Sequence, residues 1–188
     1  MKYYCCFCLI IFLVSCKNLS REKLNNITLL DNNNKSVEVE KLTGNKSALF
    51  LFMSPDCPLC INYTLTINDL YMEFSQKDIE FIIIYPGYFE KEEIIKFQQT
   101  YNFKIQGYID PDLDLIKYLD ATVTPQAILI STDGSKIYSG SIDDRMVETG
   151  RKRTVITHHY LKDAITWKLA GKTPVITYTE PVGCFIEL

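Results

Sequence analysis

The sequence lacks the features that would direct it to nucleic acid or across a membrane. Its 20 lysines and arginines are outnumbered by 23 aspartates and glutamates, so there is no basic excess to hold a phosphate backbone. It has no internal repeat and no low-complexity segment, and its apolar stretch near the start is too short to span a bilayer as a mature helix. Cysteine is scarce beyond residue 16, where it occurs only at positions 57, 60 and 184. These absences leave one mildly acidic domain whose apolar content suffices for a buried core.

The chain begins with a pattern typical of a secretory signal. Lys2 is the only early charge, residues 3–14 carry none, and Ser15 then precedes Cys16. A short basic start, an apolar stretch and a small residue before the cut describe a cleaved signal. Its end, Leu-Val-Ser-Cys at 13–16, resembles the bacterial lipobox, in which the cysteine is lipidated and becomes the new first residue. A soluble secreted protein cut nearby is the alternative.

The lipoprotein interpretation divides the chain into four parts. Residues 1–15 are a signal peptide, the polar segment 16–26 is a tether lipidated at Cys16, 27–171 form the domain, and 172–188 form a tail. The mature protein is then expected in the bacterial cell envelope, anchored to a membrane on the periplasmic side or at the surface. An exported chain meets an oxidising compartment, in which free thiols do not persist.

Strands and helices alternate along the domain. Strands are predicted at 27–30 and 37–39 around a polar turn, at 47–53, 79–86 and 105–109, and on both sides of the Asp-Gly turn at 132–135. Helices are predicted at 58–76, 91–103, 110–120 and 157–169, with Asp110 and Thr157 as candidate caps. Alternation that ends in an antiparallel hairpin predicts a mixed sheet with helices on both faces.

Two cysteines follow the apolar run at 47–53 at a spacing that suits redox chemistry. Cys57 directly precedes Pro58, which fits the first turn of a helix because proline has no amide hydrogen to leave unpaired there. Cys57 is therefore expected at or beside a helix N-cap, where free amides and the helix dipole stabilise a thiolate and lower the thiol pKa. Cys60, one turn further on, is expected to be more buried and to attack a mixed disulfide formed at Cys57.

This arrangement resembles the thioredoxin fold. The resemblance is carried by a strand, a Cys-x-x-Cys pair at a helix start, a strand, a helix and then the segment TVTPQAILI. In that family a cis proline ahead of the third core strand packs beside the reactive disulfide. Pro125 matches this proline, and Thr124 matches the residue whose backbone contacts substrates. The resemblance implies that Cys57 and Cys60 are catalytic and that Pro58, Thr124 and Pro125 bind substrate.

The N-terminal hairpin, ITLLDNNNKSVEVEKLTGNKSALFLF, further resembles the redoxin branch, which is the alkyl hydroperoxide reductase and thiol-specific antioxidant superfamily. The resemblance covers roughly residues 25–170 and implies a three-layer α/β/α fold with a mixed central sheet and an N-terminal β-hairpin extension. Two positions depart from thioredoxin, because Leu51 replaces a buried aspartate that helps to move protons and Asp56 replaces a tryptophan. An acidic neighbour opposes thiolate formation, so we expect the helix effect on Cys57 to be partly cancelled.

Direct reduction of peroxide is not favoured by the sequence. Peroxiredoxins use Pro-x-x-x-Thr/Ser-x-x-Cys, in which the proline and the hydroxyl shape the peroxide pocket. Counted back from Cys57, Ser54 fits the hydroxyl position, but Phe50 stands where the proline should be. Counted back from Cys60, neither position fits.

The C-terminal part resembles a subset of redoxin-domain proteins, and the matching residues are 142–145, 150–153, His158 or His159, and 182–184. The acidic and basic residues of the first match, Asp143, Asp144 and Arg145, are expected either to anchor a loop by an internal ion pair or to line a substrate groove. The histidines are expected to be surface or capping residues, and Lys152 and Arg153 to lie on a solvated face.

Cys184 is the third thiol of the mature chain, and the sequence leaves its role open. It is either a resolving cysteine, one half of an intermolecular disulfide, a metal ligand or a small buried apolar residue.

Two functions of different class follow. The first is a membrane-tethered thiol-disulfide oxidoreductase that exchanges disulfides with envelope proteins through Cys57 and Cys60, with no cofactor and no resident metal. Its partners are protein thiols or disulfides, a redox partner that donates or accepts electrons, and the membrane. The second is a copper-delivery protein of the same fold that uses Cys57, Cys60 and either Cys184 or a histidine. The two-residue spacing of the pair favours the first function.

Overall fold

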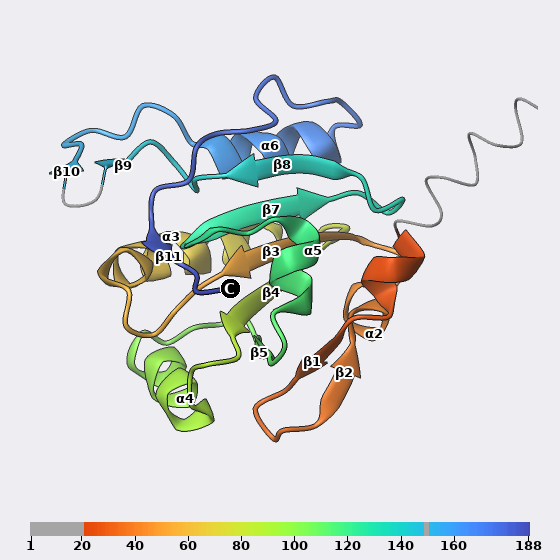
Figure 1. Cartoon of the computed structure of the whole chain (residues 1–188). Coiled ribbons are helices and arrows are strands. Elements are labelled where there is room, and N and C mark those ends of the chain that lie inside the picture. The colour runs from red at the N-terminus through yellow and green to blue at the C-terminus, as the bar shows by residue number, and fades with distance from the viewer. Residues whose placement is uncertain (1–20, 149–150) are drawn as a thin grey trace, which may run out of the picture.

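The computed structural model describes residues 21–148 and 151–188. Seven strands form one sheet in the order β2-β1-β5-β4-β3-β7-β8 (Figure 1). Strands β3, β4 and β5 run parallel to one another, and the other neighbouring pairs are antiparallel. The strands are β1 (Thr28–Leu30), β2 (Ser36–Glu38), β3 (Ser47–Phe52), β4 (Ile79–Pro86), β5 (Gly107–Asp110), β7 (Gln126–Ile130) and β8 (Lys136–Gly140). The predicted mixed sheet with its N-terminal hairpin is confirmed.

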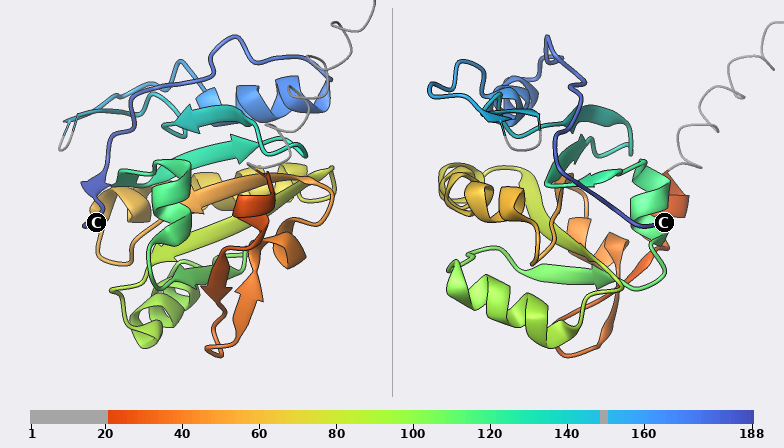
Figure 2. Two further views of the ribbon diagram at one scale, coloured as in Figure 1. Left: turned by 45° about the vertical axis from the view of Figure 1, so that its right-hand side comes forward. Right: turned by 60° about the vertical axis from the view of Figure 1, so that its left-hand side comes forward.

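Helices cover both faces of the sheet (Figures 1 and 2). One face packs against α3 (Pro58–Phe74), α4 (Lys91–Thr100) and α6 (Tyr160–Leu169). The other packs against α2 (Val39–Thr43), α5 (Asp114–Leu119) and a helical turn at residues 21–25. The chain therefore has the three-layer α/β/α arrangement of the thioredoxin fold, as its sequence predicts.

Strand β3 shows why the central strands are almost wholly apolar. Its side chains alternate between two cores, since Leu49 and Leu51 face the core below α3, whereas Phe50 and Phe52 face the core below α5. All four are at most 1% exposed. Burial of such a side chain stabilises the fold by about 1.5–3 kcal/mol, so a polar residue on either face of β3 is disfavoured.

Two predicted caps act in ways that the sequence does not reveal. Asp110 ends β5 rather than starting α5, but its carboxylate accepts hydrogen bonds from the amides of Asp114 (3.0 Å) and Ile116 (2.9 Å) in the first turn of that helix. Helix α6 starts after His159, not at Thr157, because Thr157 donates its amide (2.9 Å) and its hydroxyl to Asp144 instead.

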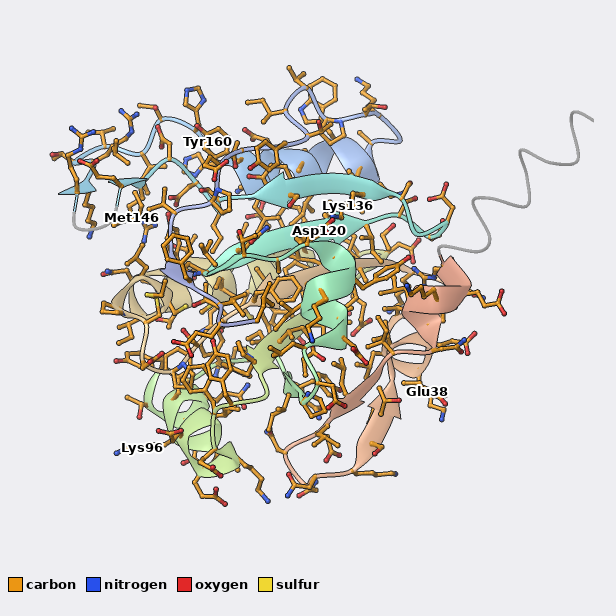
Figure 3. The ribbon with its side chains drawn as sticks, in the orientation of Figure 1. Glu38, Lys96, Asp120, Lys136, Met146 and Tyr160 are labelled. Carbon is orange, nitrogen blue, oxygen red and sulfur yellow. A yellow bond between two sulfur atoms is a disulfide. The ribbon has the colours of Figure 1, made fainter. Side chains whose placement is uncertain are left out.

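An ion pair of 2.9 Å between Lys136 and Asp120 joins β8 to the end of α5 (Figure 3).

The expected signal peptide, the lipidation site Cys16 and the first part of the tether lie outside the described residues. Residues 21–26 of the expected tether belong to the folded domain instead. Leu24 is only 1% exposed and packs in the core below α5, and Arg21 donates to the hydroxyl of Thr43 (2.9 Å). Within the part of the chain that the structure describes, no helix is both long and apolar enough to cross a membrane.

The C-terminal tail is bound to the domain along its course. After α6 it runs beside β8, where the amide of Ser139 donates to Thr177 (3.0 Å) and the amide of Thr179 donates to Ser139 (3.1 Å). It then crosses the end of the sheet to β11 (Cys184–Phe185), which pairs with β6 (Val123–Thr124) (Figures 1 and 2). The tail therefore brings the C-terminal residues to the start of α3.

A separate hairpin, β9 (Met146–Glu148) with β10 (Arg151–Lys152), precedes α6.

Candidate active site

Cys57 is the N-cap residue of α3. It follows β3 after a short loop, has extended backbone angles (φ −81°, ψ 115°), and is followed by Pro58 in the first turn. This confirms the position predicted for Cys57 from the Cys-Pro sequence. The amides of the first turn have no partner within the helix, so the positive end of α3 is directed at this sulfur.

Thr124 contacts Cys57 directly and is linked to Cys60 through Ser54. Its carbonyl oxygen is 3.1 Å from Sγ of Cys57, and its hydroxyl is 2.7 Å from that of Ser54. The amide of Ser54 in turn donates to Sγ of Cys60 (3.4 Å). The Thr124–Pro125 peptide bond is cis, as the family resemblance implies. The structure therefore brings Cys57, Cys60, Thr124 and Pro125 to one place, and Pro58 joins them through its bond to Cys57.

The disulfide of the structure joins Cys57 to Cys184, with their Cα atoms 6.2 Å apart, and Cys60 is a buried free thiol. This differs from the expectation that Cys57 and Cys60 are the bonded pair. The reason is the pairing of β11 with β6, which sets Cys184 directly opposite Thr124. Such a contact between residues 127 positions apart depends on the path of the whole tail, which sequence spacing does not reveal.

Gly183 allows the tail to approach this closely. A Cβ atom at this position would overlap the carbonyl group of Thr124, so no larger residue fits without moving the strand. The Val-Gly-Cys match at 182–184 is the sequence signal for this contact, although its structural meaning appears only in the folded chain.

The two cysteines of the predicted pair have different environments. Burial raises the pKa of the Cys60 thiol to about 12, against opposing hydrogen bonds from Ser54 and Thr124. Cys60 is therefore a neutral thiol near pH 7, whereas Cys57 stands at the helix end that favours a thiolate. The nearby charge of Asp56 adds to the rise at Cys60.

A model of the redoxin family matches residues 19–149. The chain belongs to the redoxin family. No curated protein matches it in sequence.

Solved structures with the same fold have low sequence identity to this redoxin. A hypothetical protein from Sinorhizobium meliloti is 19% identical, with a TM-score of 0.74 over 85% of this chain and 88% of that one. An uncharacterized conserved protein from Geobacillus kaustophilus is 20% identical, with a TM-score of 0.74 over 86% and 88%. A secreted disulfide oxidoreductase from Mycobacterium tuberculosis is 16% identical, with a TM-score of 0.55 over 80% and 98%. These likenesses establish the thioredoxin-like fold.

Tyr85 is a residue near the site that the sequence did not single out. It lies near the end of β4, is fully buried, and is close enough to Cys60 for a thiolate there to raise the tyrosine pKa in addition to the larger effect of burial. Its position at the carboxyl edge of a central strand is the signal that points to it, because the redoxin places Cys57 at the same edge.

Asp143 and Arg145 hold the loop after β8 against α3. Arg145 pairs with Asp143 (3.2 Å) and donates to Asn62 (2.9 Å) and Thr66 (2.8 Å), while the hydroxyl of Tyr63 donates to Asp143 (2.7 Å). Of the two roles that the sequence left open, these contacts supply the internal ion pair that anchors the loop.

Asp144 anchors the approach to α6. Burial raises its pKa, but hydrogen bonds from Thr157 and His158 outweigh that effect and bring the pKa to about 2. The carboxylate also pairs with Arg153 (3.5 Å). His158 stacks on Tyr160, with ring centroids 5.5 Å apart, and His159 caps α6 through its backbone position alone.

Within residues 21–148 and 151–188, the redoxin has no group of three or more histidine, cysteine, aspartate or glutamate side chains arranged to hold a metal ion.

Proposed function

We propose that this redoxin is a thiol-disulfide oxidoreductase that exchanges disulfides with cysteines of other proteins through Cys57 and Cys60. The observation that carries the proposal is the position of Cys57, whose sulfur lies at the N-terminus of α3 beside the carbonyl of Thr124 and is already engaged in a disulfide. A sulfur held there is both a good nucleophile and a good leaving group, because the helix end stabilises its anion.

The reaction is a two-step exchange, and in one direction it reduces a disulfide of another protein, the client. The Cys57 thiolate attacks one sulfur of the client disulfide, forms a mixed disulfide and releases the other client sulfur as a thiolate, which takes up a proton. Cys60 then loses its proton and attacks Sγ of Cys57, which forms the Cys57–Cys60 disulfide and releases the client as a dithiol. Two electrons pass to the client, and the reverse sequence oxidises it.

Cys60 is suited to the second step because of where it lies. It is the third residue of α3 after the N-cap, is fully buried, and shares Thr124 with Cys57 as a hydrogen-bonding neighbour. Its raised pKa makes it a poor nucleophile toward external disulfides, so the first attack falls to Cys57.

We further propose that the protein acts in the bacterial cell envelope, held to a membrane by lipid at Cys16. The support is the lipobox-like end of the apolar N-terminal segment and the Cys57–Cys184 disulfide, since disulfides persist in an oxidising compartment. The Mycobacterium tuberculosis protein of similar fold is described as a secreted disulfide oxidoreductase, which accords with this location by analogy.

Reduction of insulin disulfides by the full chain, with dithiothreitol as electron donor, tests the activity. The wild type should accelerate insulin precipitation, and Cys57→Ser should return it to the rate of dithiothreitol alone. Lys77→Gln, an exposed change just beyond the opposite end of α3, is the matched control and should leave the rate unchanged.

Copper content measured on the same preparation distinguishes the proposed oxidoreductase from the alternative, a copper-delivery protein. Stoichiometric copper without insulin turnover would favour copper delivery and contradict the proposed activity.

A further inference from the structure

Strand β11 is docked on the active site by its backbone as well as by its disulfide. Cys184 pairs with Thr124, Phe185 pairs with Val123, and the amide of Ile186 donates to the carbonyl of Thr122 (2.9 Å). Because Gly183 has no Cβ, its backbone can approach the backbone of Thr124 more closely than any other residue could. The position of Cys184 is therefore set by a strand pairing that continues on both sides of the sulfur.

The three cysteines differ in their access to solvent. Cys57 and Cys60 are both 0% exposed, whereas Cys184 on the tail is partly exposed. While β11 is docked, an external thiol can approach the disulfide only from the side of Cys184.

The leaving group favours the same point of attack. When a thiolate attacks Sγ of Cys184, the sulfur that departs is Cys57, and the N-terminus of α3 stabilises the departing anion. Attack on Cys57 would instead expel the sulfur of Cys184 from a strand without such a helix end. Exchange is faster from the sulfur whose thiolate is the better leaving group, so geometry and leaving group agree.

We propose that Cys184 is a third redox-active cysteine, which transfers the disulfide between the buried Cys57 and Cys60 and an external thiol. The inference rests on the proposed function, since it names the route by which that same site is returned to its dithiol state. The external partner is a thiol compound or a protein dithiol, and the client itself reacts at Cys57.

The internal transfer conserves electrons. After a client has been reduced, the Cys184 thiolate attacks Sγ of Cys57. The Cys57–Cys184 bond forms as the Cys57–Cys60 bond breaks, and Cys60 leaves with a proton as a neutral thiol. Burial favours the neutral form of Cys60, so the equilibrium lies toward the disulfide that the structure contains.

The external transfer consumes two thiols. A first thiolate attacks Sγ of Cys184, forms a mixed disulfide on the tail and releases Cys57 as a thiolate. A second thiolate attacks the external sulfur of that mixed disulfide, which leaves Cys184 as a thiolate and yields the oxidised partner. The reduced site and a free Cys184 remain, and β11 is then held by its backbone pairing and by the packing of Val182 and Ile186.

Release of β11 needs movement of only the last part of the tail. Thr179 is fixed upstream, because its hydroxyl is 2.7 Å from that of Tyr138 and accepts from the amide of Ser141 (2.9 Å). The carbonyl of Glu180 also accepts from the hydroxyl of Ser141 (3.1 Å), so the part that can leave is residues 181–188, with Ile186 withdrawn from the core below α5. Departure of this end of the tail would expose Cys57 to a client.

The test measures how fast reduced glutathione reduces the oxidised full chain, with thiols counted by alkylation and mass spectrometry. Cys184→Ser and Cys184→Ala, oxidised at Cys57–Cys60, should be reduced at about a tenth of the wild-type rate or less. Attack on Cys57 must then expel Cys60, whose raised pKa makes it a poor leaving group. Glu187→Gln, an exposed change on the same tail that keeps the sulfur, should behave as the wild type.

Glutathione reduction of both Cys184 variants at the wild-type rate, or faster, would overturn the inference. A parallel single-turnover reaction separates it from the proposed function, since pre-reduced Cys184→Ser should reduce insulin once, as the wild type does. If pre-reduced wild type cannot reduce insulin, the proposed function fails, and the glutathione rates, which need no client, still decide the role of Cys184.

Discussion

At the scale of single residues, the account depends on how differently three sulfur atoms are placed. Cys57 caps a helix and contacts Thr124, Cys60 is a buried neutral thiol behind it, and Cys184 reaches the site from the tail. These positions suit Cys57 to attack a client disulfide, Cys60 to resolve the mixed disulfide, and Cys184 to transfer the disulfide to an external thiol.

Cys60→Ser should trap the client as a mixed disulfide on Cys57, because the inner sulfur that resolves it is gone. Mass spectrometry of the alkylated chain mixed with insulin should find the adduct at Cys57, and its yield should exceed that of the wild type. Multiple turnover of insulin by Cys60→Ser at the wild-type rate would show that Cys60 does not resolve the intermediate.

Conversion of the Cys57–Cys184 disulfide to the Cys57–Cys60 disulfide should accelerate with pH. The attacking group is the Cys60 thiolate, and burial raises the pKa of this thiol to about 12. The thiolate fraction, and with it the rate, should therefore increase about tenfold per pH unit between neutral pH and the pKa. Acid quenching followed by disulfide mapping measures the rate, and a rate that levels off near pH 8 would contradict the raised pKa.

The sequence predicts part of the site at this scale. The Cys-Pro dipeptide locates Cys57 at a helix N-cap, because that placement depends on local backbone chemistry. The resemblance to the thioredoxin family, rather than local chemistry, places Thr124 beside it. The bond from Cys57 to Cys184 and the proximity of Tyr85 to Cys60 depend on tertiary packing, so spacing along the chain does not reveal them.

At the scale of elements, the strands and helices with strong hydrophobic patterns are those that the sequence locates well. The buried strands β3 and β4 and the long helix α3 match their predictions within a few residues, because each buries its own apolar pattern. Short elements were not predicted, namely α2, β6, β9, β10 and β11. β6 and β11 pair with each other across a long stretch of chain, and β9 and β10 form a short hairpin, so none of these strands has a hydrophobic pattern long enough to reveal it.

Gly183→Ala should weaken the docking of β11. The added Cβ would overlap the carbonyl group of Thr124, so the strand must move away from Cys57. We expect a lower fraction of Cys57–Cys184 disulfide at equilibrium with glutathione, measured by mass spectrometry.

Gly171→Ala is the matched control for this change. Gly171 lies at the start of the tail and has a left-handed φ of +69°, but no atom lies within 4 Å of the position of its Cβ. It should cost some stability without altering the disulfide fraction. An equal fraction in Gly183→Ala and the wild type would contradict the close approach of the two strands.

Asp144→Asn should destabilise the link between β8 and α6 at neutral pH but not in strong acid. The hydrogen bonds to the carboxylate hold its pKa at about 2, below that of an unfolded aspartate, so their stabilisation is complete above about pH 4 and is lost as the pH falls through 2. Loss of one charged hydrogen bond costs about 1.5–3 kcal/mol. Urea unfolding at pH 7 and near pH 2 measures this, and an unfolding free-energy difference that is the same at both pH values would contradict it.

At the scale of the whole molecule, one three-layer domain includes residues 21–148 and 151–188, with the tail bound across the end of the sheet. The sequence predicts this fold because its alternating strands and helices and its redoxin-like motifs agree. It does not predict that residues 21–26 pack on the domain, since their polar composition resembles a linker, whereas the burial of Leu24 and the hydrogen bond of Arg21 to Thr43 show otherwise.

Cys16→Ser should release the protein from the membrane fraction of bacteria that express the full chain. The lipobox-like sequence ends at this cysteine, and a serine cannot form the thioether that holds the lipid. Fractionation and the mass of the mature protein measure the outcome. Wild type found free of lipid and in the soluble fraction would contradict the proposed anchor while leaving the redox activity untouched.

Disulfide mapping of the wild-type chain, equilibrated over a graded series of glutathione ratios, tests the central claim most directly. We expect Cys57 to be the common partner, bonded to Cys184 in most of the oxidised chains and to Cys60 in the rest. Oxidised chains in which Cys57 remains a free thiol while Cys60 and Cys184 are bonded to each other would contradict it.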